Sequence, residues 1–334
     1  MTPVDEILLI KRSLKGKAER MVSLSKLPGF PFFIVVIFPL LFLCGCGNNV
    51  KIKTAETREM LGRDIEAFVP DKTVTYKQIG DVKLALHIFN PPSHASNQKR
   101  PAIVSFFGGG WNGGSINQFY RQSEYWASRG MVAICAEYRV RSRHKVSPFE
   151  CLKDAKSAMR WVRSHAEELG IDPERIAACG GSAGGHLAVA AATAKKFNAP
   201  SDNLKISPAA NALVLFNPVY DNSPEGYGYD RVQEQWQDFS PMHNIDENIP
   251  PAIVFLGTKD KLIPISTAQK FKEKMEAVGS RCDLFLYDGQ EHAFFNHYSK
   301  DNRYFFQTLL ESDRFLTSLG YLKGDPWIED QNIQ

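Results

Sequence analysis

The sequence predicts an α/β fold in which a mostly parallel central sheet carries helices on both faces, preceded by a β-hairpin. Short apolar runs alternate with amphipathic segments along residues 102–318. This alternation is typical of parallel strands joined by helical crossovers. The composition, 43% hydrophobic and 23% charged over 334 residues, is that of a globular protein long enough to build one large sheet.

The hairpin is expected at the start of the folded body. Residues 73–79 and 82–89 flank Gly80-Asp81, and such a turn signal between two strand-like runs predicts an antiparallel pair. A short helical segment over residues 54–67 is expected before it.

Strands and helices then alternate. Strands are expected at six apolar runs, residues 102–107, 131–138, 175–179, 212–216, 252–256 and 282–287. Helices are expected between and after them, at residues 117–129, 149–168, 183–196, 265–278 and 300–318. Residues 217–250 are a long excursion without a clear period, and a long excursion at the carboxyl edge of such a sheet is usually functional.

The first 46 residues have the layout of a secretory leader. Six basic and three acidic residues precede or border an apolar stretch that ends in Leu43-Cys44-Gly45-Cys46. This ending resembles the bacterial lipobox, which implies a lipid on Cys46 and attachment to the bacterial cell envelope. A plain signal peptide cut near Gly47 and an uncleaved anchor are the alternatives, and the true start is Met1 or Met21.

The rest of the chain is nearly neutral, because the leader carries the whole net charge of +3. A neutral body without a basic stripe argues against a nucleic-acid partner. We expect no disulfide and no metal site from its four cysteines, because they lie in apolar runs or lack zinc-ligand spacing (Cys135, Cys151, Cys179 and Cys282).

A candidate nucleophile lies in Gly180-Gly181-Ser182-Ala183-Gly184-Gly185. The segment follows an expected strand and precedes an expected helix, which is the setting of a nucleophile elbow. Glycines two residues from the serine let the backbone pass through a strained turn. The N–H of Ala183, the residue after the nucleophile, is expected to donate to the oxyanion.

Glycines also follow the first parallel strand, in Gly108-Gly109-Gly110-Trp111. Acyl transfer requires backbone N–H donors aimed at the tetrahedral oxyanion, and glycines leave those donors unobstructed. The loop occupies the strand end where an elbow-type site needs its second donor.

The expected base is His292 and the expected acid is Asp260, because an elbow-type fold places serine, acid and histidine in that chain order. Asp260 follows the strand 252–256, and His292 follows the strand 282–287. His186 is expected to be structural and His297 is the reserve base. The set implies an acyl-enzyme mechanism without metal or cofactor.

These motifs together resemble the hormone-sensitive-lipase-like branch of the α/β-hydrolases, and bacterial acetyl-xylan-esterase-like proteins most. The resemblance rests on Phe107–Trp111, Glu137-Tyr-Arg139 and 180–185. It implies an α/β-hydrolase fold and oxyanion donors from Gly109 and Gly110. We expect no large cap, because the sequence before Ser182 is too short to hold one. The chain departs from the family at Phe107, where the family has a histidine that braces the loop.

The expected divisions are a leader (1–46), a tether (47–70), a catalytic domain (71–323) and a tail (324–334). The expected substrate is a short-chain ester, either a small molecule or an acetylated plant or algal polysaccharide, with pocket walls from Trp111, Tyr220 and Trp236. A prolyl-oligopeptidase-type peptidase and a catalytically silent binding lipoprotein are the alternatives. The sequence leaves the oligomeric state open.

Overall fold

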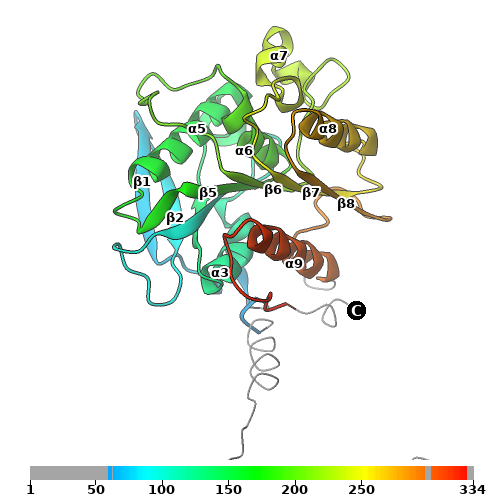
Figure 1. The fold of residues 1–334 in the computed structure, drawn as a ribbon. Helices are drawn as coiled ribbons and strands as arrows, with labels where there is room; N and C mark the ends of the chain where they lie inside the picture. The colour runs from blue at the N-terminus through cyan, green and yellow to red at the C-terminus, as the bar shows by residue number, and fades with distance from the viewer. Residues whose placement is uncertain (1–58, 62, 298–301, 329–334) are drawn as a thin grey trace, which may run out of the picture. The chain divides into compact units, whose positions relative to one another are not determined.

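The computed structural model describes residues 59–61, 63–297 and 302–328, and the leader and the Cys46 lipidation site lie outside them. The described body contains one eight-stranded sheet in the order β1-β2-β4-β3-β5-β6-β7-β8 (Figure 1). The predicted α/β-hydrolase architecture is therefore confirmed.

The strands pair as the sequence predicts. β1 is antiparallel to β2, β2 is antiparallel to β4, and every later pair is parallel. Gly80 takes a φ of +56° in the turn between β1 and β2, a conformation that glycine adopts without steric cost. The strands are β1 Lys72–Ile79, β2 Val82–Phe89, β3 Arg100–Phe106, β4 Val132–Ala136, β5 Ile171–Gly181, β6 Ala212–Phe216, β7 Ala252–Gly257 and β8 Cys282–Tyr287.

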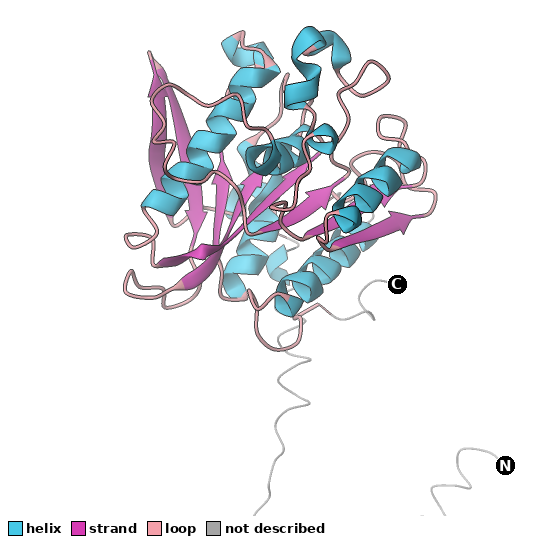
Figure 2. Ribbon diagram, turned by 45° about the horizontal axis from the view of Figure 1, so that its top comes forward, coloured by secondary structure: helices cyan, strands magenta, loops and turns pink. Residues whose placement is uncertain are grey.

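Helices cover both faces of the sheet (Figure 2). One apolar layer packs α5, α6 and α8 on one face, and a second packs α3 and α9 on the other. The main helices are α3 Tyr120–Ser128, α5 Pro148–Ser164, α6 Ala183–Thr193, α8 Ile265–Ala277 and α9 Arg303–Ser318. Among the described residues, no helix is long and apolar enough to cross a membrane.

Element boundaries differ from the predictions at a few places. β5 begins at Ile171 rather than 175, because Ile171 pairs with Arg100 across a register shift in β3. Gly170 precedes it with a φ of +61° and ends the connection from α5. In the predicted helix 54–67, residues 54–58 and 62 lie outside the description, and Ile65–Ala67 form the 3₁₀ turn η1.

The sequence missed one short helix, α4 Arg141–His144, between β4 and α5. The excursion 217–250 contains only short helical turns, so the described residues carry no large cap there. These turns are η3 Tyr229–Arg231, η4 Gln233–Gln235, α7 Trp236–Phe239 and η5 Pro241–His243.

Candidate active site

Ser182 occupies a strained turn between β5 and α6. Its φ of +52° and ψ of −118° lie outside the regions that side-chain-bearing residues favour. The turn fits only glycines around it: a Cβ on Gly184 would lie 2.0 Å from the carbonyl oxygen of Phe106, and one on Gly185 would lie 2.6 Å from the Pro218 side chain. This turn places Ser182 at the carboxyl end of β5, immediately before the N-terminus of α6.

A hydrogen-bonded relay runs from Ser182 to Asp260. Ser182 Oγ lies 2.9 Å from His292 Nε2, and His292 Nδ1 lies 2.7 Å from Asp260 Oδ2. The other carboxylate oxygen of Asp260 accepts the backbone N–H groups of Leu262 at 2.8 Å and Ile263 at 3.0 Å. The Asp260 side chain is fully buried, and these backbone hydrogen bonds fix the orientation of its carboxylate toward His292.

The structure adds Asn217, which the sequence analysis did not single out. Asn217 follows β6, is fully buried and has a φ of +35°. Its Oδ1 accepts the N–H of Ala293 at 3.0 Å, and its Nδ2 faces His292 Nε2 at 3.3 Å. Only its position in the chain could have indicated a role, because Asn217 directly follows β6, the neighbour of the strand that ends at the nucleophile.

The glycine loop after β3 lies against the elbow. A Cβ on Gly108 would lie 3.0 Å from the Gly181 carbonyl oxygen and 3.5 Å from the Ser182 Cβ. Gly109 and Gly110 have φ values of +125° and +60°, which favour glycine. Within the described residues, nothing accepts a hydrogen bond from the backbone N–H of Gly109, Gly110 or Ala183, so all three donors remain for a ligand.

Aromatic packing and an amide hold this loop in place of the family's histidine. Phe107 stacks on Tyr138 with ring centroids 4.0 Å apart, and the Tyr138 hydroxyl donates to the Phe107 carbonyl oxygen at 2.6 Å. The Gly108 N–H donates to Gln118 Oε1 at 2.6 Å. Gln118, the second residue that the sequence did not indicate, donates in turn to Asn296 Oδ1 at 3.1 Å.

Ser182 opens into a pocket of about 450 Å³. Leu262 and Phe295 give it apolar walls, and Tyr227 and Arg231 lie at its other side. The remaining lining residues are glycines, polar residues and one alanine: Gly108, Gly109, Gly110, Asn112, Gln118, Ser182, Asn217, His292 and Ala293.

The predicted aromatic walls are not where the sequence suggested. Tyr220 is fully buried and stacks on Phe271 with centroids 4.4 Å apart, so the prediction that it contacts substrate is wrong. Trp236 packs edge-on against His243 and lies outside the lining of the Ser182 pocket. Trp111 is 1% exposed and forms the floor of a neighbouring pocket instead.

The other histidines lie outside the Ser182 pocket. His186 is fully buried, its Nε2 lies 3.1 Å from the Phe239 carbonyl oxygen, and burial lowers its pKa to about 3. Burial also lowers the pKa of His297 to about 4, and His297 packs edge-on against Phe305. Among the described residues, no group of three potential metal ligands converges.

Comparisons with known proteins agree with this architecture. A family model described as BD-FAE matches residues 86–224, and the dienelactone hydrolase family model matches residues 209–309. The apo form of Thermogutta terrifontis esterase 2 has a TM-score of 0.73 and 45% identity, covering 76% of this chain and 96% of that chain. The same esterase phosphorylated by paraoxon has a TM-score of 0.72, with the same identity and coverage.

Two curated relatives are similar over part of their length. Esterase LipC of Mycobacterium tuberculosis is 32% identical over 221 residues, which is 58% of this chain and 54% of that protein. Acetylxylan esterase of Xylanibacter ruminicola is 25% identical over 243 residues, which is 67% of this chain and 46% of that protein. The chain therefore spans about half the length of these curated relatives.

Proposed function

Because this chain belongs to the α/β-hydrolase esterases, we propose that it is a carboxylesterase that hydrolyses short-chain esters through an acyl-enzyme on Ser182. The observation that carries the proposal is the continuous relay from Ser182 Oγ through His292 to Asp260, at 2.9 and 2.7 Å. A hydroxyl becomes a nucleophile when a base in hydrogen-bond reach takes its proton, and a carboxylate behind the base holds the required tautomer.

In this mechanism, Ser182 Oγ attacks the ester carbonyl carbon while its proton moves to His292 Nε2. The N–H groups of Gly109, Gly110 and Ala183 bind the oxyanion that forms. His292 then protonates the leaving alcohol. In the second half, a water molecule attacks the acyl carbon while its proton moves to His292 Nε2, and His292 returns that proton to Ser182 Oγ as the acid leaves. The Asp260 carboxylate accepts a hydrogen bond from His292 Nδ1 and stabilises the imidazolium in both steps.

The shape of the Ser182 pocket supports a small acyl group on a polar alcohol. Leu262, Ala293 and Phe295 give a short apolar surface that suits a small acyl group. Asn112, Gln118 and Arg231 in the same lining offer polar contacts to the alcohol. Together with the similarity to an acetylxylan esterase, this supports the acetyl esters of carbohydrates as the substrate class.

Ester turnover with a nucleophile-free control tests the proposal. Acetylated xylan, feruloylated arabinoxylan and p-nitrophenyl esters of graded acyl length are offered to the wild type and to Ser182→Ala. We expect the highest kcat/KM on acetyl esters and a loss of about 10⁶-fold in the variant. A peptide p-nitroanilide is added to the panel, and its cleavage without cleavage of the carbohydrate esters favours the peptidase. Equal, background rates in both proteins on every substrate favour a silent binding protein.

We further propose that the protein is exported and anchored to the cell envelope by a lipid on Cys46. The basic, apolar and small-residue order of residues 1–46 supports this. The full-length chain, expressed in a bacterium, should partition into the detergent phase of a Triton X-114 extract, and Cys46→Ala should partition into the aqueous phase. Identical partitioning of the two proteins contradicts the anchor.

A further inference from the structure

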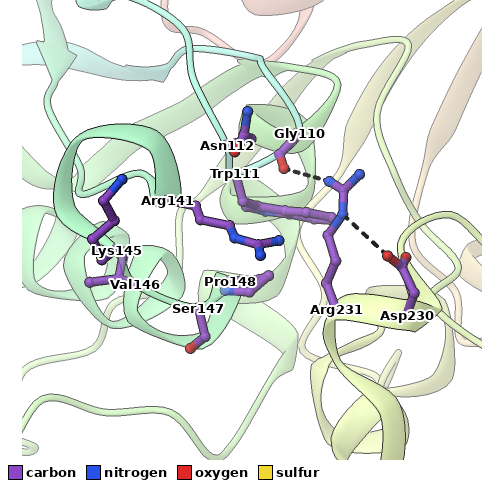
Figure 3. A pocket seen from close by; sticks show the side chains of 10 residues that line it. All are labelled: Gly110, Trp111, Asn112, Arg141, Lys145, Val146, Ser147, Pro148, Asp230 and Arg231. Atoms are coloured by element: carbon purple, nitrogen blue, oxygen red, sulfur yellow. Dashed lines mark hydrogen bonds and ion pairs between the residues drawn. The ribbon is translucent and has the colours of Figure 1, made fainter.

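A second pocket, of about 740 Å³, lies beside the glycine loop (Figure 3). It shares Gly110, Asn112 and Arg231 with the pocket at Ser182. The two pockets therefore adjoin at the glycine loop. We call the second one the cationic pocket. Its further lining residues are Trp111, Arg141, Lys145, Val146, Ser147, Pro148 and Asp230.

Positive charge dominates the lining of this pocket. Arg141 and Lys145 come from α4 and its C-terminal cap, and Arg231 comes from η3. Figure 3 shows the side chains of Arg141 and Arg231 reaching the pocket from different elements, and Arg231 Cζ lies 5.5 Å from the centroid of the Tyr227 ring. Asp230 is the one carboxylate in the lining, so the pocket has an excess of two positive charges.

Two of these cations lack an acidic partner. No carboxylate of the described residues lies within 4.0 Å of the side-chain nitrogens of Arg141 or Lys145. Lys145 Nζ makes a single hydrogen bond, to the Ser142 carbonyl oxygen at 3.3 Å. Unpaired cations that gather in one concave site raise the local concentration of anions.

Arg231 is held at the junction by the backbone. Its Nη1 donates to the Gly110 carbonyl oxygen at 2.7 Å, while its Nε lies 3.9 Å from Asp230, whose side chain is 80% exposed. The weak pair with Asp230 leaves most of the five N–H donors of the guanidinium free. A planar guanidinium fork fits the two oxygens of an anionic group in a bidentate way.

Resting on the proposed esterase function, we propose that the cationic pocket binds an anionic substituent on the carbohydrate whose ester is cleaved at Ser182. Trp111 and Pro148 are buried beneath this pocket, and the guanidinium groups of Arg141 and Arg231 offer an anion charge-assisted hydrogen bonds. A uronic-acid carboxylate and a sugar sulfate are the two sources of such an anion, and both present two or more oxygens to the guanidinium forks.

Matched sugar esters test the proposal. The three substrates are monoacetylated methyl glucuronide, monoacetylated methyl glucoside and monoacetylated methyl glucoside 6-sulfate, which differ only in the substituent at carbon 6. We expect the wild type to have a higher kcat/KM for one of the anionic sugars than for the neutral one. Arg141→Gln should lower this anionic-to-neutral ratio by about tenfold, the worth of one hydrogen bond to a charged group.

Arg143→Gln is the matched control. Arg143 belongs to the same short helix α4, donates to the Gly114 carbonyl oxygen at 2.9 Å and lines neither pocket. Arg143→Gln removes the same charge as Arg141→Gln. Because Arg143 lines neither pocket, this variant should leave the anionic-to-neutral ratio unchanged. An equal fall of the ratio in both variants shows general surface electrostatics and overturns the proposal, as does a wild-type ratio at or below one.

A binding measurement separates this proposal from the esterase function. Ser182→Ala, which retains the cationic pocket, should bind the acetylated glucuronide or the sulfate at least about tenfold more tightly than the glucoside. If Ser182→Ala shows this binding preference but the wild type turns over none of the three sugars, the esterase proposal is contradicted and the anion-site proposal is supported. Turnover of the neutral sugar without a binding preference contradicts the anion site and retains the esterase.

Discussion

The pocket at Ser182 and the cationic pocket lie on either side of Gly110, and they are built in opposite ways. In the first, Asp260 and Asn217 have fully buried side chains, and both polar atoms of each side chain make hydrogen bonds. In the second, Arg141 and Lys145 are exposed, and neither pairs with a described carboxylate.

The two pockets should therefore differ in how they respond to substitution. Buried, fully bonded groups tolerate little change, because removing one partner leaves another without a hydrogen bond. Exposed charges on a short helix are exchanged at little cost in stability. We therefore infer that bond cleavage is determined by the buried relay and substrate preference by the exposed rim.

The largest expected effect comes from Asp260→Asn, in the buried relay. The N–H groups of Leu262 and Ile263 should hold the new amide oxygen, so that its NH₂ faces His292 Nδ1. His292 then carries its proton on Nε2 and cannot accept the one from Ser182. We expect a loss of about 10⁴-fold in kcat with the fold intact; kcat within tenfold of wild type contradicts the assignment of the acid.

The glycine loop is shared by both pockets, and Gln118→Leu tests what holds it. The substitution leaves the Gly108 N–H without its acceptor at 2.6 Å and loosens the donors that bind the oxyanion. A decrease of about 30-fold in kcat is expected from one buried donor left unpaired.

Gln122→Leu is the control for the loop, because Gln122 is a buried glutamine whose Oε1 has no hydrogen-bond partner among the described residues. It should retain wild-type kcat. If both glutamine variants lose activity equally, the loop is not held through Gln118.

Asn217→Ala should have a smaller effect, because His292 keeps its contacts with Ser182 and Asp260. Loss of the contact between Asn217 Nδ2 and His292 Nε2 at 3.3 Å removes one neutral hydrogen bond, worth about tenfold in kcat. The substitution also leaves the Ala293 N–H without its acceptor at 3.0 Å and places alanine at a φ of +35°, so the melting temperature should fall as well. An unchanged kcat shows that Asn217 does not position the imidazole.

The buried histidine beneath the cationic pocket, His186, should make the free energy of unfolding depend on pH. His186 packs edge-on under Trp111, with ring centroids 5.1 Å apart, and burial lowers its folded pKa to about 3. The unfolded chain binds a proton near pH 6.5, so the stabilisation is complete above that pH and is lost as the pH falls toward 3. The wild type should lose about 2 kcal/mol more than His186→Gln between pH 7 and pH 5, by urea unfolding.

Much of the fold and the Ser182 site follows from local sequence. β6 and β8 have the predicted bounds, and the elbow, the glycine loop, Asp260 and His292 lie in the predicted order at one edge of the sheet. These elements are predictable because apolar runs, glycines and chain order are local signals. Their catalytic roles remain predictions until activity is measured.

The rest depends on contacts between distant segments. Tyr220 and Trp236 occupy a stretch without a period, where the sequence does not tell a buried ring from an exposed one, and both are absent from the lining of the Ser182 pocket. Asn217 contacts His292, which is 75 residues away, and Gln118 donates to Asn296, which is 178 residues away. Arg141 and Arg231 are likewise brought to one pocket by the tertiary fold alone.

The central claim is that Ser182 is the nucleophile activated by His292, and covalent labelling tests it most directly. Paraoxon phosphorylates the similar Thermogutta terrifontis esterase 2. After treatment of this protein with paraoxon, peptide mass spectrometry should find a single phosphoryl adduct on Ser182, and His292→Ala should be labelled far more slowly. An adduct on another residue, or equal labelling of the His292→Ala variant, contradicts the account.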